Sequence, residues 1–382
     1  MRKCKLSARS LCMIAALALL TACATGPVNL VGLSQVQHPL AIPAGIKVQN
    51  IFVATSRLRS EDAAEFFSGE RSQVMGLGNV NVTIPPNHQL GQIEQPRSGK
   101  SDLSTHFTIA RPALYRNSSV FRDNINRELA KRSPGNRSVL VFVHGYNTNF
   151  SGALLRMAQF VNDTNFQGVP VLFTWASRGR ALDYVYDINS ALQARFYLME
   201  LASILAATNA ESFSVVAHSM GNLATLEAMT GLARQGFNPK ADLNSVILAA
   251  PDVDFDLFEE YIKDLGPIKE KIYVLVSKDD RALTLSRRIA GGVSRVGTAD
   301  PEKLADLGLK VVDLSLVDDK SSNNHSKFAD SPEIVQLIGT GINQGNTLAT
   351  ANSVNSPDLI GSLFQSFSDV ATGIGGVLTV DQ

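Results

Sequence analysis

The sequence AHSMG at 217–221 has the residue types and spacing needed to present a serine hydroxyl as a nucleophile. It follows an apolar run at 212–217 and opens a helix-period stretch at 220–234. A sharp strand-to-helix turn lifts the serine out of a sheet, and small residues two positions before and after it avoid clashes. The turn also leaves the Met220 N–H at a helix N-terminus, where it could bind an oxyanion. Ser219 is therefore the candidate nucleophile, with an ordinary strand–helix turn as the alternative.

A nucleophilic serine needs a base, and the base needs an acid that orients it. In sheets of this kind the chain order is serine, acid, histidine. His325 is the only histidine after Ser219, so it is assigned as the base largely by elimination. It follows the last apolar run and precedes a helix expected from Pro332. The alternative is a surface histidine in a polar loop.

The acid has several candidates, all of them aspartates that follow strand ends. Asp280 is preferred because it starts the turn into the next helix, which would leave Asp279 as a solvated neighbour. The alternatives are Asp279 itself and the pair Asp252 and Asp254. Asp254 is also well placed to cap a helix at 255–265.

The segment HGYN at 144–147 fits the other half of an oxyanion hole, with the Tyr146 N–H as its donor. His144 and His218 end strands beneath the site, where packing and hydrogen bonding explain them best. Trp175 and Tyr184, with Tyr186 and Asp187, follow another strand end and are candidates to line a substrate pocket. For Trp175, core packing is an equally good interpretation.

These residues can meet only if the ends of several strands lie at one edge of a sheet. From Arg137 onwards the sequence pattern predicts such a sheet. Short apolar runs that predict buried parallel strands lie at 138–143, 169–174, 212–217, 244–250, 271–277 and 309–314. Helix-period stretches between them lie at 149–162, 187–208, 220–234 and 255–265. Alternating units of this kind predict a doubly wound, mostly parallel α/β sheet whose ligands bind at the carboxyl ends of the strands.

The part before this region is expected to be β-rich, either as the antiparallel start of the main sheet or as a small N-terminal elaboration. Strand-like patterns lie at 46–57, 79–84 and 106–110, and a helix is expected at 121–132. We therefore expect one domain over 46–340, with extra N-terminal strands in 46–120. Residues 341–382 are poor in charge and rich in Gly, Ser, Asn and Thr, which is typical of a flexible tail.

The N-terminus predicts export and a lipid anchor. Four basic residues precede an apolar run at 11–20, which is too short to span a bilayer and is typical of a signal peptide over 1–22. LTAC at 20–23 resembles the bacterial lipobox, in which Cys23 would be acylated, for example with palmitate. A tether over 23–45 would follow, and Ala24 after the cysteine indicates the outer membrane, facing the periplasm. The alternative is an ordinary secretory signal.

Cysteine usage and charge exclude several other classes. All three cysteines lie at or before Cys23, so the mature chain has no thiol for disulfides, zinc or catalysis. Without the four basic residues of the signal, 31 basic and 35 acidic side chains remain, a net charge of −4. We see no basic stripe of the kind that binds nucleic acid. Neither a phosphate-binding glycine loop nor a metal-ligand spacing is evident, so no cofactor is expected.

Taken together, the motifs resemble an uncharacterised family of bacterial α/β-hydrolase-like proteins that includes many lipoproteins. The matching stretches are ATSR at 54–57, VFVHGYNTNF, LFTWASRG, YVYDINSA, VVAHSMGN, AAPDVD, YVLVSKDDRAL and the His-Ser at 325–326. The resemblance implies the α/β-hydrolase fold and a triad of Ser219, Asp280 and His325, but no substrate. Ala176 stands where the pattern has proline.

Two functions follow from these observations. The first is a serine hydrolase that acts on carboxylic esters or lipid acyl groups, for which acyl transfer to another acceptor would use the same residues. The second is an envelope-anchored scaffold or binding protein with a hydrolase fold and little catalysis. Protein partners and oligomeric state are not indicated by any motif.

Overall fold

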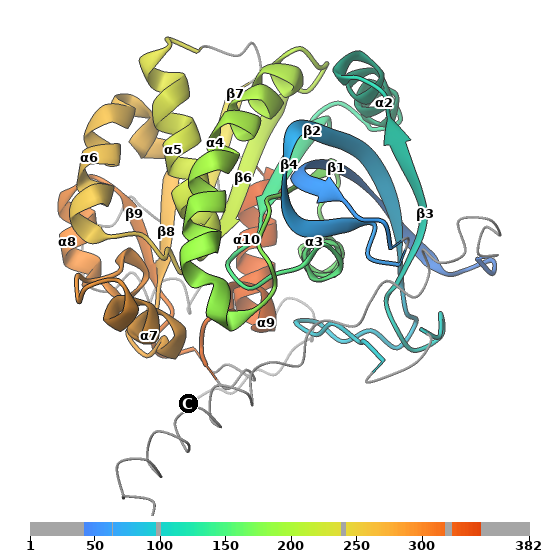
Figure 1. The fold of residues 1–382 in the computed structure, drawn as a ribbon. Helices are drawn as coiled ribbons and strands as arrows, with labels where there is room; N and C mark the ends of the chain where they lie inside the picture. The colour runs from blue at the N-terminus through green and yellow to red at the C-terminus, as the bar shows by residue number, and fades with distance from the viewer. Residues whose placement is uncertain (1–41, 63, 97–100, 238–241, 318–322, 345–382) are drawn as a thin grey trace, which may run out of the picture.

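The computed structural model describes residues 42–62, 64–96, 101–237, 242–317 and 323–344. Cys23, the expected signal peptide and most of the expected tether and tail lie outside these residues. In the described part of the chain, nine strands form one sheet in the order β3-β2-β1-β5-β4-β6-β7-β8-β9 (Figure 1). The β1–β2 and β2–β3 pairs are antiparallel and all other neighbours are parallel.

The strands are β1 (Lys47–Arg59), β2 (Phe67–Ile84), β3 (Thr108–Tyr115), β4 (Ser138–Val143), β5 (Val169–Thr174), β6 (Ser212–His218), β7 (Asp242–Ala249), β8 (Ile272–Val276) and β9 (Lys310–Asp313). The α-helices are α2 (Ser118–Ala130), α3 (Phe150–Asp163), α4 (Tyr184–Ala206), α5 (Gly221–Arg234), α6 (Phe255–Leu265), α7 (Arg281–Ile289), α8 (Pro301–Asp306), α9 (Lys327–Asp330) and α10 (Pro332–Gln344). Short 3₁₀ turns lie at η2 (Ala181–Asp183), η3 (Gly266–Lys271) and η4 (Val296–Thr298).

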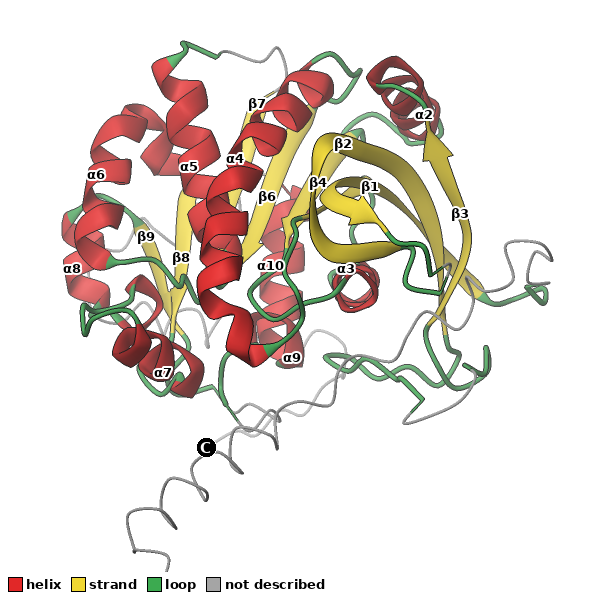
Figure 2. Cartoon of the chain, viewed as in Figure 1, coloured by secondary structure: helices red, strands yellow, loops and turns green. Residues whose placement is uncertain are grey.

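Helices cover both faces of the sheet and bury two separate apolar layers (Figure 2). One layer contains Phe121 of α2, Leu198 of α4 and Phe258 of α6. The other contains Phe160 of α3 and Ile338 of α10. Because both faces are covered, β4 and β5 are apolar along nearly their whole length, as parallel strands in such a sheet must be.

The expected fold class is confirmed, and so are most of the expected elements. The runs at 138–143 and 169–174 are β4 and β5 with the same ends. The strand expected at 79–84 is wrong in length, because it is only the last third of β2. Glycines interrupt the apolar pattern of β2, and they are needed there because a Cβ on Gly78 would lie 2.3 Å from the Ala113 carbonyl oxygen.

The N-terminal strands are part of the main sheet. β1 lies between β2 and β5 and pairs with β5 from Phe52 to Thr55. Ile51, Phe52 and Val53 are almost completely buried. This segment therefore shares the core with the α/β units and brings its C-terminal end to the carboxyl ends of the parallel strands.

Candidate active site

Ser219 occupies the sharp turn between β6 and α5. Its φ is +54°, in the left-handed region that non-glycine residues rarely adopt. The turn is fixed by the Ser219 N–H, which donates to the Ala249 carbonyl at 3.0 Å, and by the Asn222 side chain, which donates to the Ser219 carbonyl at 2.9 Å. A Cβ on Gly221 would lie 2.3 Å from the His144 carbonyl oxygen, which explains why a glycine stands two residues after the serine.

The loop that follows β4 lies directly against this serine. A Cβ on Gly145 would be 2.8 Å from the Ser219 Cβ and 2.9 Å from His218 Nδ1. Only a glycine allows this approach. Tyr146, whose N–H is the expected oxyanion donor, is the next residue, and Met220, the other expected donor, is buried at the start of α5.

Asp280 and His325 are in direct contact, although 45 residues separate them. His325 Nδ1 lies 2.6 Å from Asp280 Oδ2, and the aspartate side chain is completely buried. The second carboxylate oxygen accepts the Leu283 N–H at 2.9 Å and caps α7. One carboxylate therefore orients the histidine and starts the helix. His325 keeps 13% of its side chain exposed.

His218 connects this pair to the serine turn. Its ring centroid is 4.7 Å from that of His325, and its Nε2 donates to the His325 carbonyl at 3.0 Å. Burial, together with the neighbouring His325, lowers the pKa of His218 well below its usual value. A neutral His218 thus packs beneath His325 next to Ser219, in agreement with the packing role expected from the sequence.

The other candidate acids have different partners. Asp279 binds Lys327 Nζ with both oxygens, at 2.8 and 2.9 Å, and accepts from Asn324 Nδ2 at 2.7 Å. Lys327 and Asn324 flank His325, so Asp279 holds the histidine loop and is not simply a solvated neighbour. Asp254 caps α6, as expected.

Asp252 belongs to a buried network that contacts the serine turn. Its N–H donates to the Ser219 carbonyl at 3.2 Å. Its carboxylate accepts from Ser286 Oγ at 2.5 Å and from Tyr184 OH at 3.1 Å, and Arg295 Nε lies 3.3 Å away. The contact of Asp280 with His325 therefore distinguishes it from all three alternative aspartates.

The sequence profile of a family described as alpha/beta hydrolases of unknown function (DUF900) matches residues 117–341, more than half of the 382-residue chain. The chain belongs to this family. This agrees with the resemblance to an uncharacterised α/β-hydrolase family found in the sequence motifs. A comparison with curated proteins gave no match.

Several solved structures are similar at low identity. An esterase from Pyrobaculum calidifontis is 10% identical, with 89% of this chain and 94% of that chain covered and a TM-score of 0.34. Esterase B from Lactobacillus rhamnosis is 10% identical, with 95% and 100% covered and a TM-score of 0.35. A fungal esterase from Rhizomucor miehei is 11% identical, with 97% and 98% covered and a TM-score of 0.32.

The family span begins after β3, yet an arginine from β1 reaches the site. Arg57 is 1% exposed and donates to the carbonyls of Thr148 at 2.6 Å and Ser177 at 2.7 Å, and to Thr174 Oγ1 at 2.7 Å. Burial lowers the pKa of Arg57 to about 9, so it remains charged at neutral pH. Arg57 thus holds the loops after β4 and β5 together. The sequence motif ATSR contained this residue, but nothing in its neighbourhood indicated the role.

His144 completes this arrangement as a neutral ring. Burial, followed by the charge of Arg57, lowers its pKa to about 3. Its Nδ1 is 2.8 Å from the Gly145 carbonyl and must donate there, which leaves Nε2 to accept from Thr174 Oγ1 at 3.0 Å and from the Trp175 N–H at 3.2 Å. The first residue of the Tyr146 loop is therefore fixed through its side chain.

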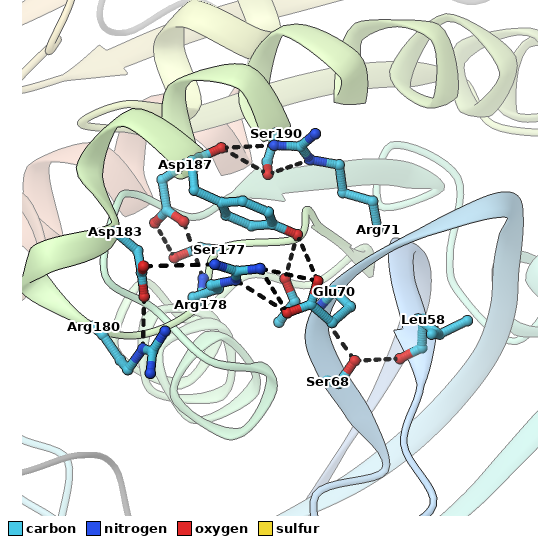
Figure 3. A network of polar contacts seen from close by, with 12 residues as sticks. Leu58, Ser68, Glu70, Arg71, Ser177, Arg178, Arg180, Asp183, Asp187 and Ser190 are labelled. Atoms are coloured by element: carbon cyan, nitrogen blue, oxygen red, sulfur yellow. Dashed lines mark hydrogen bonds and ion pairs between the residues drawn. The ribbon is translucent and has the colours of Figure 1, made fainter.

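Asp187 supports the same loop from α4 (Figure 3). It is fully buried, and it accepts from Ser177 Oγ at 2.5 Å and from the N–H groups of Arg178 at 3.0 Å and Asn147 at 3.4 Å. Figure 3 shows the Arg178 side chain between Glu70 and Asp183. Its guanidinium nitrogens lie 3.0 Å from the Glu70 carboxylate and 3.6 Å from the Asp183 carboxylate. Through Glu70, β2 is connected to the start of α4.

The two candidate pocket residues differ in their surroundings. Trp175 is completely buried, stacks on His144 with ring centroids 5.0 Å apart, and donates to the His144 carbonyl at 2.8 Å. It packs in the core, which was the alternative interpretation. Tyr184 is 7% exposed, and its ring lies edge to face with that of Tyr146 at 5.2 Å. In the described ranges, no group of three or more His, Cys, Asp or Glu side chains is placed to hold a metal ion.

Proposed function

We propose that this protein is a serine hydrolase that cleaves carboxylic esters, including lipid acyl esters, with Ser219, His325 and Asp280 as its triad. The observation that carries the proposal is the 2.6 Å contact between the buried Asp280 carboxylate and His325 Nδ1. This contact engages Nδ1, so in the proposed mechanism Nε2 is the nitrogen that takes and returns the serine proton. The strained conformation of Ser219 in the turn after β6 supports the same assignment.

In the first half of the proposed reaction, Ser219 Oγ forms a bond to the carbonyl carbon, and its proton passes to His325 Nε2. The resulting oxyanion accepts hydrogen bonds from the Met220 and Tyr146 N–H groups, and each such donor supplies about 3 kcal/mol of transition-state stabilisation. The carbon–oxygen bond to the alcohol then breaks, and the alcohol leaves with the proton from His325. Asp280 stays ionised throughout and stabilises the imidazolium.

In the second half, His325 removes a proton from water, and the hydroxide oxygen attacks the acyl carbon. The acyl–serine bond breaks, the acid departs, and Ser219 recovers its proton. An acceptor alcohol in place of water would turn the same steps into acyl transfer. Arg57 and Asp187 are buried and fix the loop that carries Tyr146. A fixed oxyanion donor is useful for catalysis, so these contacts favour the hydrolase over the scaffold function.

The proposal is tested with a fluorophosphonate probe, which forms a covalent bond only with an activated serine. The wild-type chain should be labelled, and Ser219→Ala and His325→Ala should not. Ser245→Ala, which changes a buried serine of β7 that bonds to Ser214, is the matched control and should be labelled like the wild type. A folded wild-type protein that is not labelled would contradict the proposal and favour the scaffold function.

We also propose that the chain is a lipoprotein anchored through Cys23 at the outer membrane and facing the periplasm. The support is the lipobox-like LTAC sequence behind a short apolar run. After metabolic labelling with radioactive palmitate, the wild-type protein in the membrane fraction should carry the label, and the Cys23→Ala protein should not. Palmitate incorporation into Cys23→Ala would contradict this assignment.

None of the helices in the described ranges is both long and apolar enough to cross a bilayer.

A further inference from the structure

Large apolar side chains are exposed on two segments that leave the carboxyl ends of the parallel strands. Leu182 in η2 is 90% exposed and Val185 at the start of α4 is 68% exposed. On α7, Leu285 is 46% and Ile289 is 56% exposed. Singly exposed apolar residues are ordinary, but a contiguous group of them marks an interaction surface.

The two segments lie side by side. Tyr184 OH is 2.7 Å from Ser286 Oγ, so the first turn of α4 contacts the middle of α7. Both side chains bind the Asp252 carboxylate. Figure 1 shows α7 and the start of α4 at the same lower edge of the molecule. The exposed residues next to Tyr184 and Ser286 therefore lie on two neighbouring segments, and we call this group the rim face: Leu182, Val185, Leu285, Ile289, Arg287 and Arg288.

The rim face is basic as well as apolar. Helix α7 carries Arg281, Arg287 and Arg288 and no acidic residue. Arg287 and Arg288 occupy its last turn and are exposed. On the neighbouring segment, Arg180 is paired with Asp183 at 2.6 Å, so that segment adds little net charge. Apolar side chains interspersed with arginines are what an anionic lipid surface attracts.

The position of this face links it to the site. Helix α7 begins directly after Asp280, whose other oxygen contacts His325, and Tyr184 packs on Tyr146. A surface that receives the rim face would therefore lie beside the loop that carries the expected oxyanion donor. We propose that the rim face docks on a phospholipid bilayer with anionic headgroups and presents lipid acyl esters to Ser219. Docking of the rim face does not depend on the hydrolase proposal, whereas the choice of lipid acyl esters as substrate rests on the proposed function.

The test places an environment-sensitive fluorophore at one position of the full chain. The three native cysteines, at positions 4, 12 and 23, are replaced by alanine, so that Ile289→Cys supplies the only thiol. The matched control is Phe196→Cys in the same background, because Phe196 is 60% exposed further along α4. Each labelled protein is mixed with vesicles of phosphatidylcholine, with or without phosphatidylglycerol.

Docking predicts a blue shift and an intensity gain of about twofold or more at position 289 with anionic vesicles, and no change at position 196. Arg287→Glu with Arg288→Glu should weaken the vesicle affinity at least roughly tenfold. An unchanged spectrum at position 289 would overturn docking of the rim face and point to a protein as its occupant. An equal change at position 196 would also overturn it, because the bilayer would then contact the chain without preference for the rim face. Docking that persists in Ser219→Ala, without turnover of vesicle esters by the wild type, would overturn the hydrolase proposal alone.

Discussion

Asp279 and Asp280 are adjacent in the chain, but their carboxylates hold different parts of the site. Asp280 is buried and contacts the ring of His325, whereas Asp279 is 42% exposed and binds the two residues, Asn324 and Lys327, that flank it. The carboxylate that orients the imidazole should determine turnover, and the one that anchors the loop should determine mainly stability. Substitution by asparagine separates the two roles because it keeps the size and removes the charge.

Asp280→Asn should lower kcat for a short-chain ester by roughly 10⁴-fold, because a neutral amide no longer holds the imidazole in the right tautomer or stabilises the imidazolium. Asp279→Asn should lower the free energy of unfolding by about 2 kcal/mol, because it leaves the buried Lys327 ammonium without its anion, and should lower kcat less than tenfold. Steady-state kinetics and urea unfolding of both variants measure this. The reverse ranking of the two kcat values would make Asp279 the triad acid.

Arg57 acts through the backbone of the loop after β4. Arg57→Met removes the donors to the Thr148 and Ser177 carbonyls and should lower kcat about 10²-fold with little change in KM, because the proposed oxyanion donor, the Tyr146 N–H, would be misplaced while substrate binding would not change. Arg57→Lys should recover part of kcat. The measurement is kcat and KM corrected for the labelled fraction in a fluorophosphonate titration.

Arg71→Met is the control for Arg57→Met. Arg71 also comes from the N-terminal strands, but it binds Ser190 Oγ at 2.8 Å and the Tyr186 carbonyl at 3.1 Å on α4. Arg71→Met should lower the stability of the fold and leave kcat within a few-fold of the wild-type value. If Arg57→Met and Arg71→Met lost kcat equally, Arg57 would stabilise the fold in general and would not position the site.

At the residue scale, the sequence identified the groups that strand ends carry and missed those that act from a distance. Ser219 lies in a strand–turn–helix motif, and His325 follows the last strand. Both positions can be recognised from the neighbouring sequence. The role of Arg57 cannot, because its partners Thr148 and Ser177 are 91 and 120 residues away along the chain. The choice between Asp279 and Asp280 likewise depends on a contact with residue 325 that no local pattern specifies.

At the scale of elements, buried apolar runs were sufficient to locate the parallel strands, because a strand covered on both faces admits few polar residues. They were not sufficient for β2, where exposed and buried positions mix and glycines stand at close approaches to Thr55 and Ala113. The position of β1 between β2 and β5 is a long-range pairing that a strand pattern cannot specify.

The segment after β2 is fixed to the end of α3 by His88. Its Nε2 is 2.6 Å from Asp163 and its Nδ1 is 2.8 Å from Glu94. Burial alone lowers the pKa of His88, but the hydrogen bonds to the two carboxylates outweigh it and the net shift is upward. The pKa of Asp163 lies below its usual value, since hydrogen bonds, first among them that of His88, outweigh the effect of burial.

Because the folded pKa of His88 is raised, its contribution to stability is fully present below the unfolded value of about 6.5 and is lost as the pH rises through the folded pKa. His88→Gln should therefore lower the free energy of unfolding by about 2 kcal/mol near pH 6 and by less at higher pH. Asp163 stays ionised over this range. Urea unfolding at several pH values, with His106→Gln as the control, tests this, and a pH-independent difference would refute it.

At the scale of the whole molecule, the family-matched span and the folded unit are not the same. The match covers residues 117–341, whereas the sheet continues through β5 into β1, β2 and β3. Removing these strands would expose Val171, Leu172 and Phe173 of β5, which are now completely buried. It would also remove Arg57, and with it the arginine contacts to the loop that carries the expected oxyanion donor.

A chain of residues 117–344 should therefore fail to fold, whereas one of residues 42–344, which keeps every described element, should fold. Ile51, Phe52, Val53, Val80 and Val82 are at most 2% exposed, and each such side chain contributes about 2 kcal/mol on burial. Their combined loss, roughly 10 kcal/mol, equals the whole stability of a typical domain. Size-exclusion chromatography and urea unfolding followed by circular dichroism compare the two chains. Cooperative unfolding of monomeric 117–344 would show that the α/β units form a core without β1, and that the N-terminal strands serve the site alone.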